Sequence, residues 1–124
     1  MKPRNRMSPR GTSIKIVNLE EGMPLVREAL LRLDRELAIA TQHHNHFVKF
    51  VHGYGSSGVG GDIRIAVQKS LRESVAAGRI RACIFGEDWS ISDERTWRLL
   101  TSHPDLKQDR DLGRRNLGIT IVAL

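Results

Sequence analysis

The residues best suited to chemistry lie in one loop, His52-Gly-Tyr-Gly-Ser-Ser-Gly-Val-Gly-Gly-Asp-Ile-Arg64. Its histidine can transfer a proton near neutral pH, and its arginine pairs with phosphate oxygens through a planar fork. Glycines let backbone N–H groups approach an anion closely, and serines add hydroxyl donors. We therefore expect a phosphate or carboxylate to contact the following residues: Gly53, Tyr54, Gly55, Ser56, Ser57, Gly58, Gly60, Gly61 and Arg64.

Hydrophobic patterning places this loop between a strand and a helix. Residues 47–51 are bulky and β-branched, as in a buried strand, and an apolar stripe follows from Asp62 to Ala77 at helical spacing. The N-terminus of a helix presents unpaired N–H groups and the positive end of the helix dipole. This position favours anion binding more than the glycines alone do.

The rest of the chain alternates strands and helices. Strands are predicted over 14–19, 47–51, 79–85 and 119–124, and helices over 24–42, 62–77 and 90–101. The order β-α-β-α-β-(α)-β predicts an α/β two-layer sandwich, with helices packed on a mixed four-stranded sheet. The first three strands should be parallel through right-handed crossovers, and the direction of the fourth stays open.

Length and composition predict a single domain. Of the 124 residues, 13–124 form the predicted domain, and 1–12 form a basic tail that is predicted to be disordered. No run of apolar residues is long enough to cross a membrane, and no secretory signal is recognisable. The single cysteine, Cys83, excludes an intramolecular disulfide and is expected in the core. We expect a cytoplasmic monomer.

The charge balance indicates a polyanionic partner. The net charge is +6, and 15 of the 20 basic residues are arginine. Basic side chains that neutralise phosphates release counterions, which favours binding to DNA or RNA. Tyr54 is expected either to stack on a base or to pack on the loop's own backbone, and Trp89 is expected beside the same surface.

Two nucleotide-binding motifs fit the loop poorly. Gly53 to Gly58 matches GxGxxG, but the first acid after the next strand, Glu87, comes 29 residues after Gly58, whereas a dinucleotide site expects one after about 20. A Walker A loop is excluded because no Gly-Lys-Ser/Thr follows.

His-Gly-x-Gly after a strand, with Ile63-Arg64 in the next helix, resembles the Smr (small MutS-related) family. The closing segment Gly118-Ile-Thr-Ile-Val-Ala-Leu124 is also similar to that family's last strand. The resemblance spans about residues 13–124. It implies a β-α-β-α-β-β scaffold similar to the C-terminal domain of translation initiation factor 3, and binding or cleavage of DNA or RNA.

Two departures from the family pattern bear on cleavage. The loop is longer than usual, and the family's Leu-Asp-x-His-Gly motif is absent, with Asn18 and Glu20 at its aspartate and histidine positions. In an endonuclease, His52 and Glu20 would move protons and Arg64 would stabilise the charged phosphate. No cofactor is expected to be required, and Mg²⁺ or Mn²⁺ could take part only in a catalytic protein. The alternatives are a non-catalytic nucleic-acid or ribosome-associated binding module, and a binder of a small anionic ligand.

Other polar clusters are interpreted mainly as structural. The histidines of His43-His44-Asn-His46 should form a solvated helix end rather than a metal site. Glu87 and Asp88 should cap a turn, the alternative being a magnesium or manganese site shared with Glu20. The acids of the 105–111 segment should be solvated, and Trp97 should be part of the core. No protein-bound metal site is predicted from these clusters.

Overall fold

The computed structural model describes residues 14–54 and 59–124, in which four strands form one sheet. In spatial order these are β1 (Ile14–Asn18), β2 (Phe47–Val51), β4 (Ile119–Ala123) and β3 (Ala82–Phe85). Strands β1 and β2 are parallel, whereas β4 runs antiparallel to both β2 and β3. The mixed sheet is confirmed, and the direction left open by the sequence is antiparallel.

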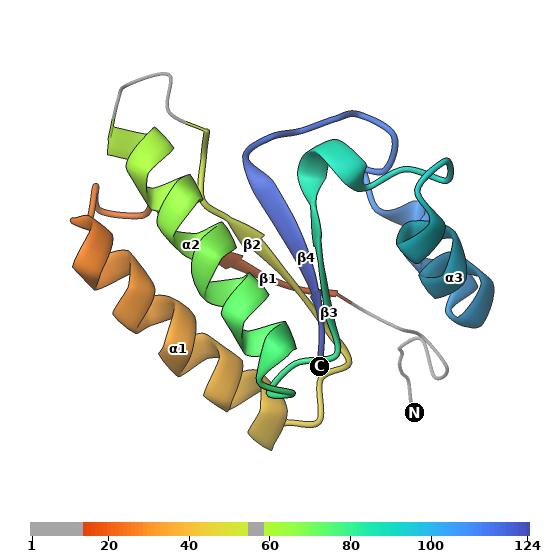
Figure 1. The fold of residues 1–124 in the computed structure, drawn as a ribbon, viewed down its shortest axis with the longest axis horizontal. Coiled ribbons are helices and arrows are strands. Elements are labelled where there is room, and N and C mark those ends of the chain that lie inside the picture. The colour runs from red at the N-terminus through yellow and green to blue at the C-terminus, as the bar shows by residue number, and fades with distance from the viewer. Residues whose placement is uncertain (1–13, 55–58) are drawn as a thin grey trace, which may run out of the picture.

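Two long helices cover one face of the sheet (Figure 1). These are α1 (Val26–Gln42) and α2 (Val59–Ala76). Their apolar stripes bury Leu33 and Leu71 against Val48 and Phe50 of β2. The helix α2 begins at Val59 rather than at the predicted Asp62, so its first turn includes Gly60 and Gly61.

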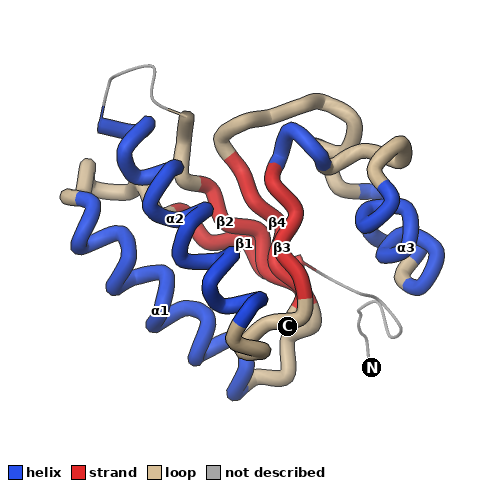
Figure 2. The backbone as a smooth tube through the Cα atoms, viewed as in Figure 1, coloured by secondary structure: helices blue, strands red, loops and turns tan. Residues whose placement is uncertain are grey.

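The opposite face is also covered, so the predicted two layers become three (Figure 2). The short helix α3 (Glu94–Ser102) and the 3-10 turn Pro104–Gln108 pack there through Leu100 and Leu106. Their partners in the sheet include Phe47 of β2. A third layer is needed because the strands are apolar on both faces, as in sheets buried on both sides.

The environment of α3 confirms one local prediction and corrects another. Asp93 caps the helix, since its Oδ2 accepts a hydrogen bond of 3.0 Å from the Thr96 N–H. Trp97 is 57% exposed rather than part of the core, because Thr96 and Leu100 face inward. Cys83 is buried as predicted. No helix among the described residues is long and apolar enough to span a membrane.

Candidate functional site

The ends of three strands converge with the segment that enters β4, at the upper end of the sheet in Figure 1. The N–H groups of His52 and Gly53 both donate to the Gly118 carbonyl, at 2.9 and 3.1 Å. The Leu19 N–H donates to the Val51 carbonyl at 2.8 Å. These bonds bring the residues that follow β1 and β2 beside the chain entering β4.

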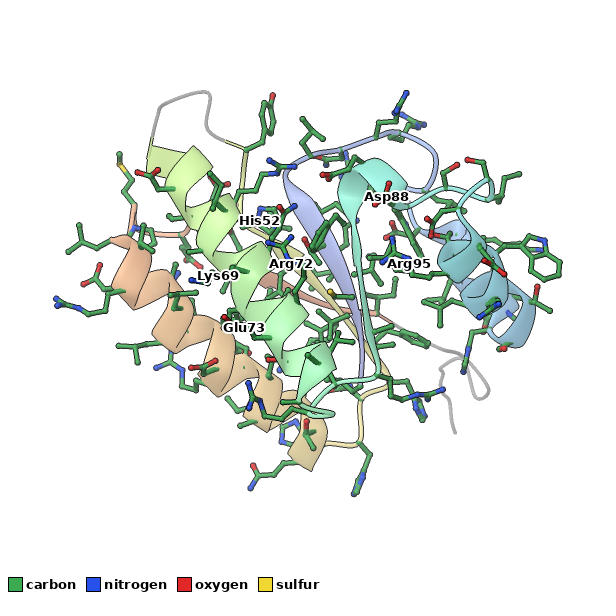
Figure 3. The ribbon with its side chains drawn as sticks, in the orientation of Figure 1. His52, Lys69, Arg72, Glu73, Asp88 and Arg95 are labelled. Atoms are coloured by element: carbon green, nitrogen blue, oxygen red, sulfur yellow. The ribbon has the colours of Figure 1, made fainter. Side chains whose placement is uncertain are left out.

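His52 lies on the face of the sheet that α1 and α2 cover, and its side chain is fully buried (Figure 3). Its Nδ1 is 2.7 Å from the Gly53 carbonyl, and its Nε2 is 2.9 Å from the Thr120 hydroxyl. Burial lowers the pKa of His52, outweighing the opposite effect of the bond to Gly53. The ring is therefore neutral at physiological pH. Since a carbonyl only accepts, Nδ1 carries the proton and Nε2 accepts from Thr120.

Glu20 lies directly against Gly53. A Cβ added at Gly53 would stand 2.0 Å from Glu20 Oε2, and the φ of +74° at Gly53 also favours glycine. Asn18 Oδ1 accepts a 2.8 Å hydrogen bond from the Glu20 N–H and so shapes the turn after β1. The Glu20 carboxylate thus lies at the end of β2, next to His52. The Glu20 side chain is exposed, whereas His52 is buried.

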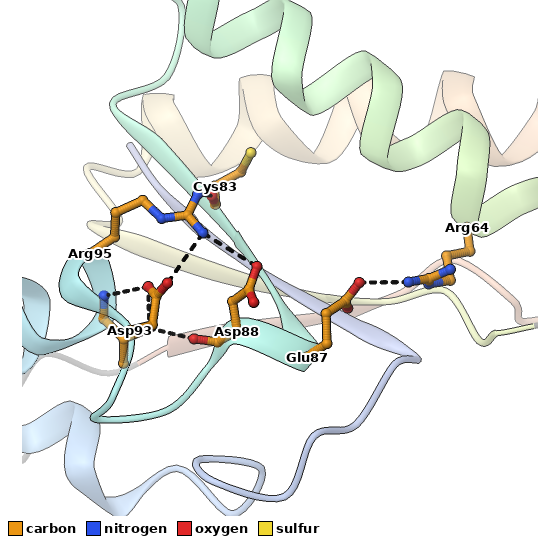
Figure 4. Close-up of polar contacts among 7 residues, drawn as sticks. Arg64, Cys83, Glu87, Asp88, Asp93 and Arg95 are labelled. Carbon is orange, nitrogen blue, oxygen red and sulfur yellow. Dashed lines mark hydrogen bonds and ion pairs between the residues drawn. The ribbon is translucent and has the colours of Figure 1, made fainter.

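Arg64 ties α2 to two other segments of this edge. Its Nη2 donates to Glu87 Oε2 at 2.7 Å (Figure 4). Its Nε donates to the Leu117 carbonyl at 3.2 Å. Arg64 therefore fastens the helix to the turn after β3 and to the chain entering β4. The charge expected to meet a phosphate is already paired with a carboxylate.

The carboxylates of Glu87 and Asp88 face arginines, not a shared cation site. Glu87 pairs with Arg64, while Asp88 Oδ2 lies 3.4 Å from Arg95 Nη2 (Figure 4). Within residues 14–54 and 59–124, no group of three His, Cys, Asp or Glu side chains is placed to hold a metal ion. The magnesium or manganese alternative built on Glu20, Glu87 and Asp88 is therefore wrong, because the three acids do not converge. The exposed histidines after α1 are likewise part of no such group.

A buried ion cluster connects β2 with the segment before β4. Lys49 is 3% exposed and pairs with Asp111 and, at 3.0 Å, with Asp109. The prediction that Asp109 and Asp111 are solvated is thus wrong. Burial opposes ionisation of Asp111, but hydrogen bonds from Lys49 and Asn116 outweigh it and lower its pKa. Trp89 is fully buried and donates to Asp109 at 3.0 Å, so it supports this segment from inside.

The segment held by this cluster forms one wall of a groove next to the glycine loop. We call residues 110–116 the arginine turn. The groove has a volume of about 440 Å³ and is lined by Tyr54, Arg110, Asp111, Arg114, Arg115, Asn116 and Leu117. Arg115 adopts a φ of 55°, a region that non-glycine residues rarely occupy and that is enriched at functional sites.

The charges of the arginine turn remain available. Among the described residues, the guanidinium groups of Arg110, Arg114 and Arg115 form no hydrogen bond and no ion pair, and all three are exposed. The charge of Arg110 also helps to lower the pKa of Asp111. Sequence reasoning missed these residues. The signal for them was the pair Arg114-Arg115, which follows a glycine at 113 and comes shortly before the last strand.

The predicted site residues thus fall into three groups. His52, Gly53, Glu20 and Arg64 meet at one edge of the sheet, and Tyr54 is 58% exposed beside them. Gly60 and Gly61 lie in α2. Four of the predicted contacts lie outside the described residues: Gly55, Ser56, Ser57 and Gly58.

One solved structure is similar to this architecture, the crystal structure of the Smr domain of Thermus thermophilus MutS2. The two share 24% sequence identity with a TM-score of 0.55, over 89% of this chain and 96% of that one. No family model and no curated protein sequence matches the chain. The chain has the fold of an Smr domain. The fold expected from the His52-Gly-Tyr-Gly segment and the closing strand is confirmed.

Proposed function

We propose that this Smr-like domain binds DNA or RNA through the groove between Tyr54 and the arginine turn. The observation that supports this is the set of three exposed guanidinium groups on one wall of a groove, none of which forms an ion pair within residues 14–54 and 59–124. Such charges gain free energy by neutralising phosphates and releasing counterions. The net charge of +6 adds a long-range attraction to polyanions.

The arginine turn is also preorganised for this contact. The buried pairs of Lys49 with Asp109 and Asp111 hold the segment against the sheet, and the Asn116 side chain donates to Asp111 at 3.0 Å. A segment fixed before binding loses less conformational entropy when it meets its ligand. Support from the sheet therefore favours a binding role for these arginines.

The test is a fluorescence-anisotropy titration with DNA and RNA at several salt concentrations. We expect log affinity to fall linearly with log salt, by several units. The variant carrying both Arg114→Gln and Arg115→Gln should lower that slope by about 2, because each arginine contacts about one phosphate. Arg98→Gln is the matched control, since Arg98 pairs with Glu94 on the exposed side of α3. Absence of affinity for every DNA and RNA at low salt would contradict the proposal.

A second candidate function is phosphodiester cleavage at the neighbouring edge. Its support is the juxtaposition of the exposed Glu20 carboxylate with Gly53, beside His52 and the Arg64–Glu87 pair. In this arrangement Glu20 is the accessible group for moving a proton, and His52 holds the strand end in place. Any Mg²⁺ or Mn²⁺ would have to be held largely by the nucleic acid and water.

Cleavage is tested on supercoiled plasmid and on structured RNA, with and without Mg²⁺ or Mn²⁺. An endonuclease should lose activity in Glu20→Gln, with little change in binding. Glu21→Gln is the matched control, because it changes the same charge at the next position. Intact substrates under all conditions would leave a non-catalytic binding module. Cleavage unaffected by Glu20→Gln and His52→Ala would show that the assigned residues are wrong.

A further inference from the structure

Tyr54 presents an aromatic surface at the mouth of the groove. The side chain is 58% exposed, yet its ring rests on the chain entering β4, since a Cβ added at Gly118 would stand 3.4 Å from Tyr54 Cδ1. Gly118 is itself fixed by the hydrogen bonds that its carbonyl accepts from His52 and Gly53. The ring is therefore both supported from below and accessible.

The polar groups of the groove are already used within the protein. The Asn116 side chain donates to Asp111 at 3.0 Å and accepts from the Gly118 N–H at 2.8 Å. Asp111 in turn pairs with buried Lys49. Hydrogen-bonded side chains of this kind are poorly placed to read the edges of a base. What the groove offers is charge from the arginines and a flat ring from Tyr54.

This combination matches one form of nucleic acid better than another. A ring can stack only on a base whose face is free, and the faces of paired bases inside a duplex are covered by their neighbours. Sites for single strands combine a basic groove with aromatic platforms, and they tolerate many sequences because every base has a flat face. The volume of about 440 Å³ lies within the range of about 300–1,000 Å³ typical of small-ligand pockets.

We propose, resting on the nucleic-acid-binding function above, that this groove selects unpaired nucleotides. Tyr54 stacks on an unpaired base while Arg110, Arg114 and Arg115 contact the flanking phosphates. The preferred ligand is then a single strand, or an unpaired segment within a longer molecule. Selection would depend on the absence of pairing and little on base identity.

The experiment compares the full chain on three labelled probes of about 12 nucleotides: single-stranded DNA, single-stranded RNA of the same sequence, and the DNA duplex. At equal salt, wild type should bind the single strands more tightly than the duplex. Tyr54→Leu should weaken single-strand binding by about 5- to 150-fold, the range for loss of one stacked base. It should leave the duplex affinity and the salt slope nearly unchanged, and Tyr54→Phe should retain the wild-type preference.

The outcomes separate this inference from the proposed function. Duplex binding as tight as single-strand binding, or an equal loss on both in Tyr54→Leu, overturns the inference and leaves nucleic-acid binding intact. Wild-type affinity retained by Tyr54→Leu on single strands also overturns it. No binding to any probe overturns both proposals. A preference for RNA over DNA would place the ribose 2′-hydroxyl in the contact, and equal affinity would place only bases and phosphates there.

Discussion

The His52 end of the loop and the arginine turn lie at the same end of the sheet, but they differ in what they leave available. His52 is buried with both ring nitrogens bonded, whereas the three guanidinium groups of the turn are exposed and, among the described residues, unpaired. The motif residues hold strand ends together. The proposed contact surface falls on a neighbouring segment that matches no motif. The motif thus marks the fold, whereas the proposed binding surface is marked by exposed charges that form no ion pair among the described residues.

The largest effect is expected at Lys49, whose pairs with Asp109 and Asp111 hold the arginine turn against the sheet. Lys49→Met should leave two buried carboxylates without their cation and lower the free energy of unfolding by about 3–5 kcal/mol. Urea denaturation measures this change. Lys15→Met is the matched control, because the Lys15–Glu36 pair is partly exposed and should contribute at most about 1 kcal/mol. Equal losses in the two variants would show that the cluster adds no special support.

A smaller effect is expected where the end of β3 touches the arginine turn. A Cβ added at Gly86 would stand 1.7 Å from the Asn116 carbonyl oxygen, so the backbone must move. Gly86→Ala should cost about 1–3 kcal/mol of stability and weaken nucleic-acid binding by displacing the turn. Denaturation and anisotropy measure the two effects.

Gly78→Ala supplies the control for this substitution. It has a positive φ of 74° and open space around the added Cβ, far from the turn. It should cost about 1–2 kcal/mol through backbone strain alone and leave affinity unchanged. Equal losses of affinity in Gly86→Ala and Gly78→Ala would show that binding does not depend on the position of the arginine turn.

The smallest effect is a pH dependence at the buried end of the loop. The pKa of His52 is lowered below 6.5, so the unfolded chain binds its proton more readily than the folded chain does. The stability that depends on neutral His52 is complete above about pH 6.5 and is lost as pH falls toward the folded-state pKa. The slope cannot exceed about 1.4 kcal/mol per pH unit, because one proton is involved.

Denaturation between about pH 5 and 7 measures this slope, which should disappear in His52→Gln. His43→Gln serves as the control, because His43 is exposed at the end of α1. A slope retained in His52→Gln would assign the proton to another group.

Local sequence patterns predicted the helices and strands well. They did not predict which charged side chains pair with one another in the folded chain. The helices, the strands and the meeting of Glu20, Gly53 and Arg64 follow from hydrophobic periodicity and from strand ends that share one edge. The burial of Asp109 and Asp111 does not, because their partner Lys49 lies 60 residues from Asp109 in the chain. Which arginines stay unpaired likewise depends on contacts between segments distant in sequence. The third layer follows from apolar residues on both faces of the strands, such as Phe47 and Val48, since a two-layer arrangement would cover only one face.

The sheet order has a consequence for synthesis on the ribosome. The strand β4 comes last of the four in the chain, yet it lies between β2 and β3. Until it emerges, β2 has an open edge and β3 has no strand beside it, and open edges invite pairing with other chains. Synthesis proceeds at about 5–20 residues per second, so the incomplete sheet persists for seconds. Those two edges stay unpaired until β4 has been synthesised and has emerged from the ribosome.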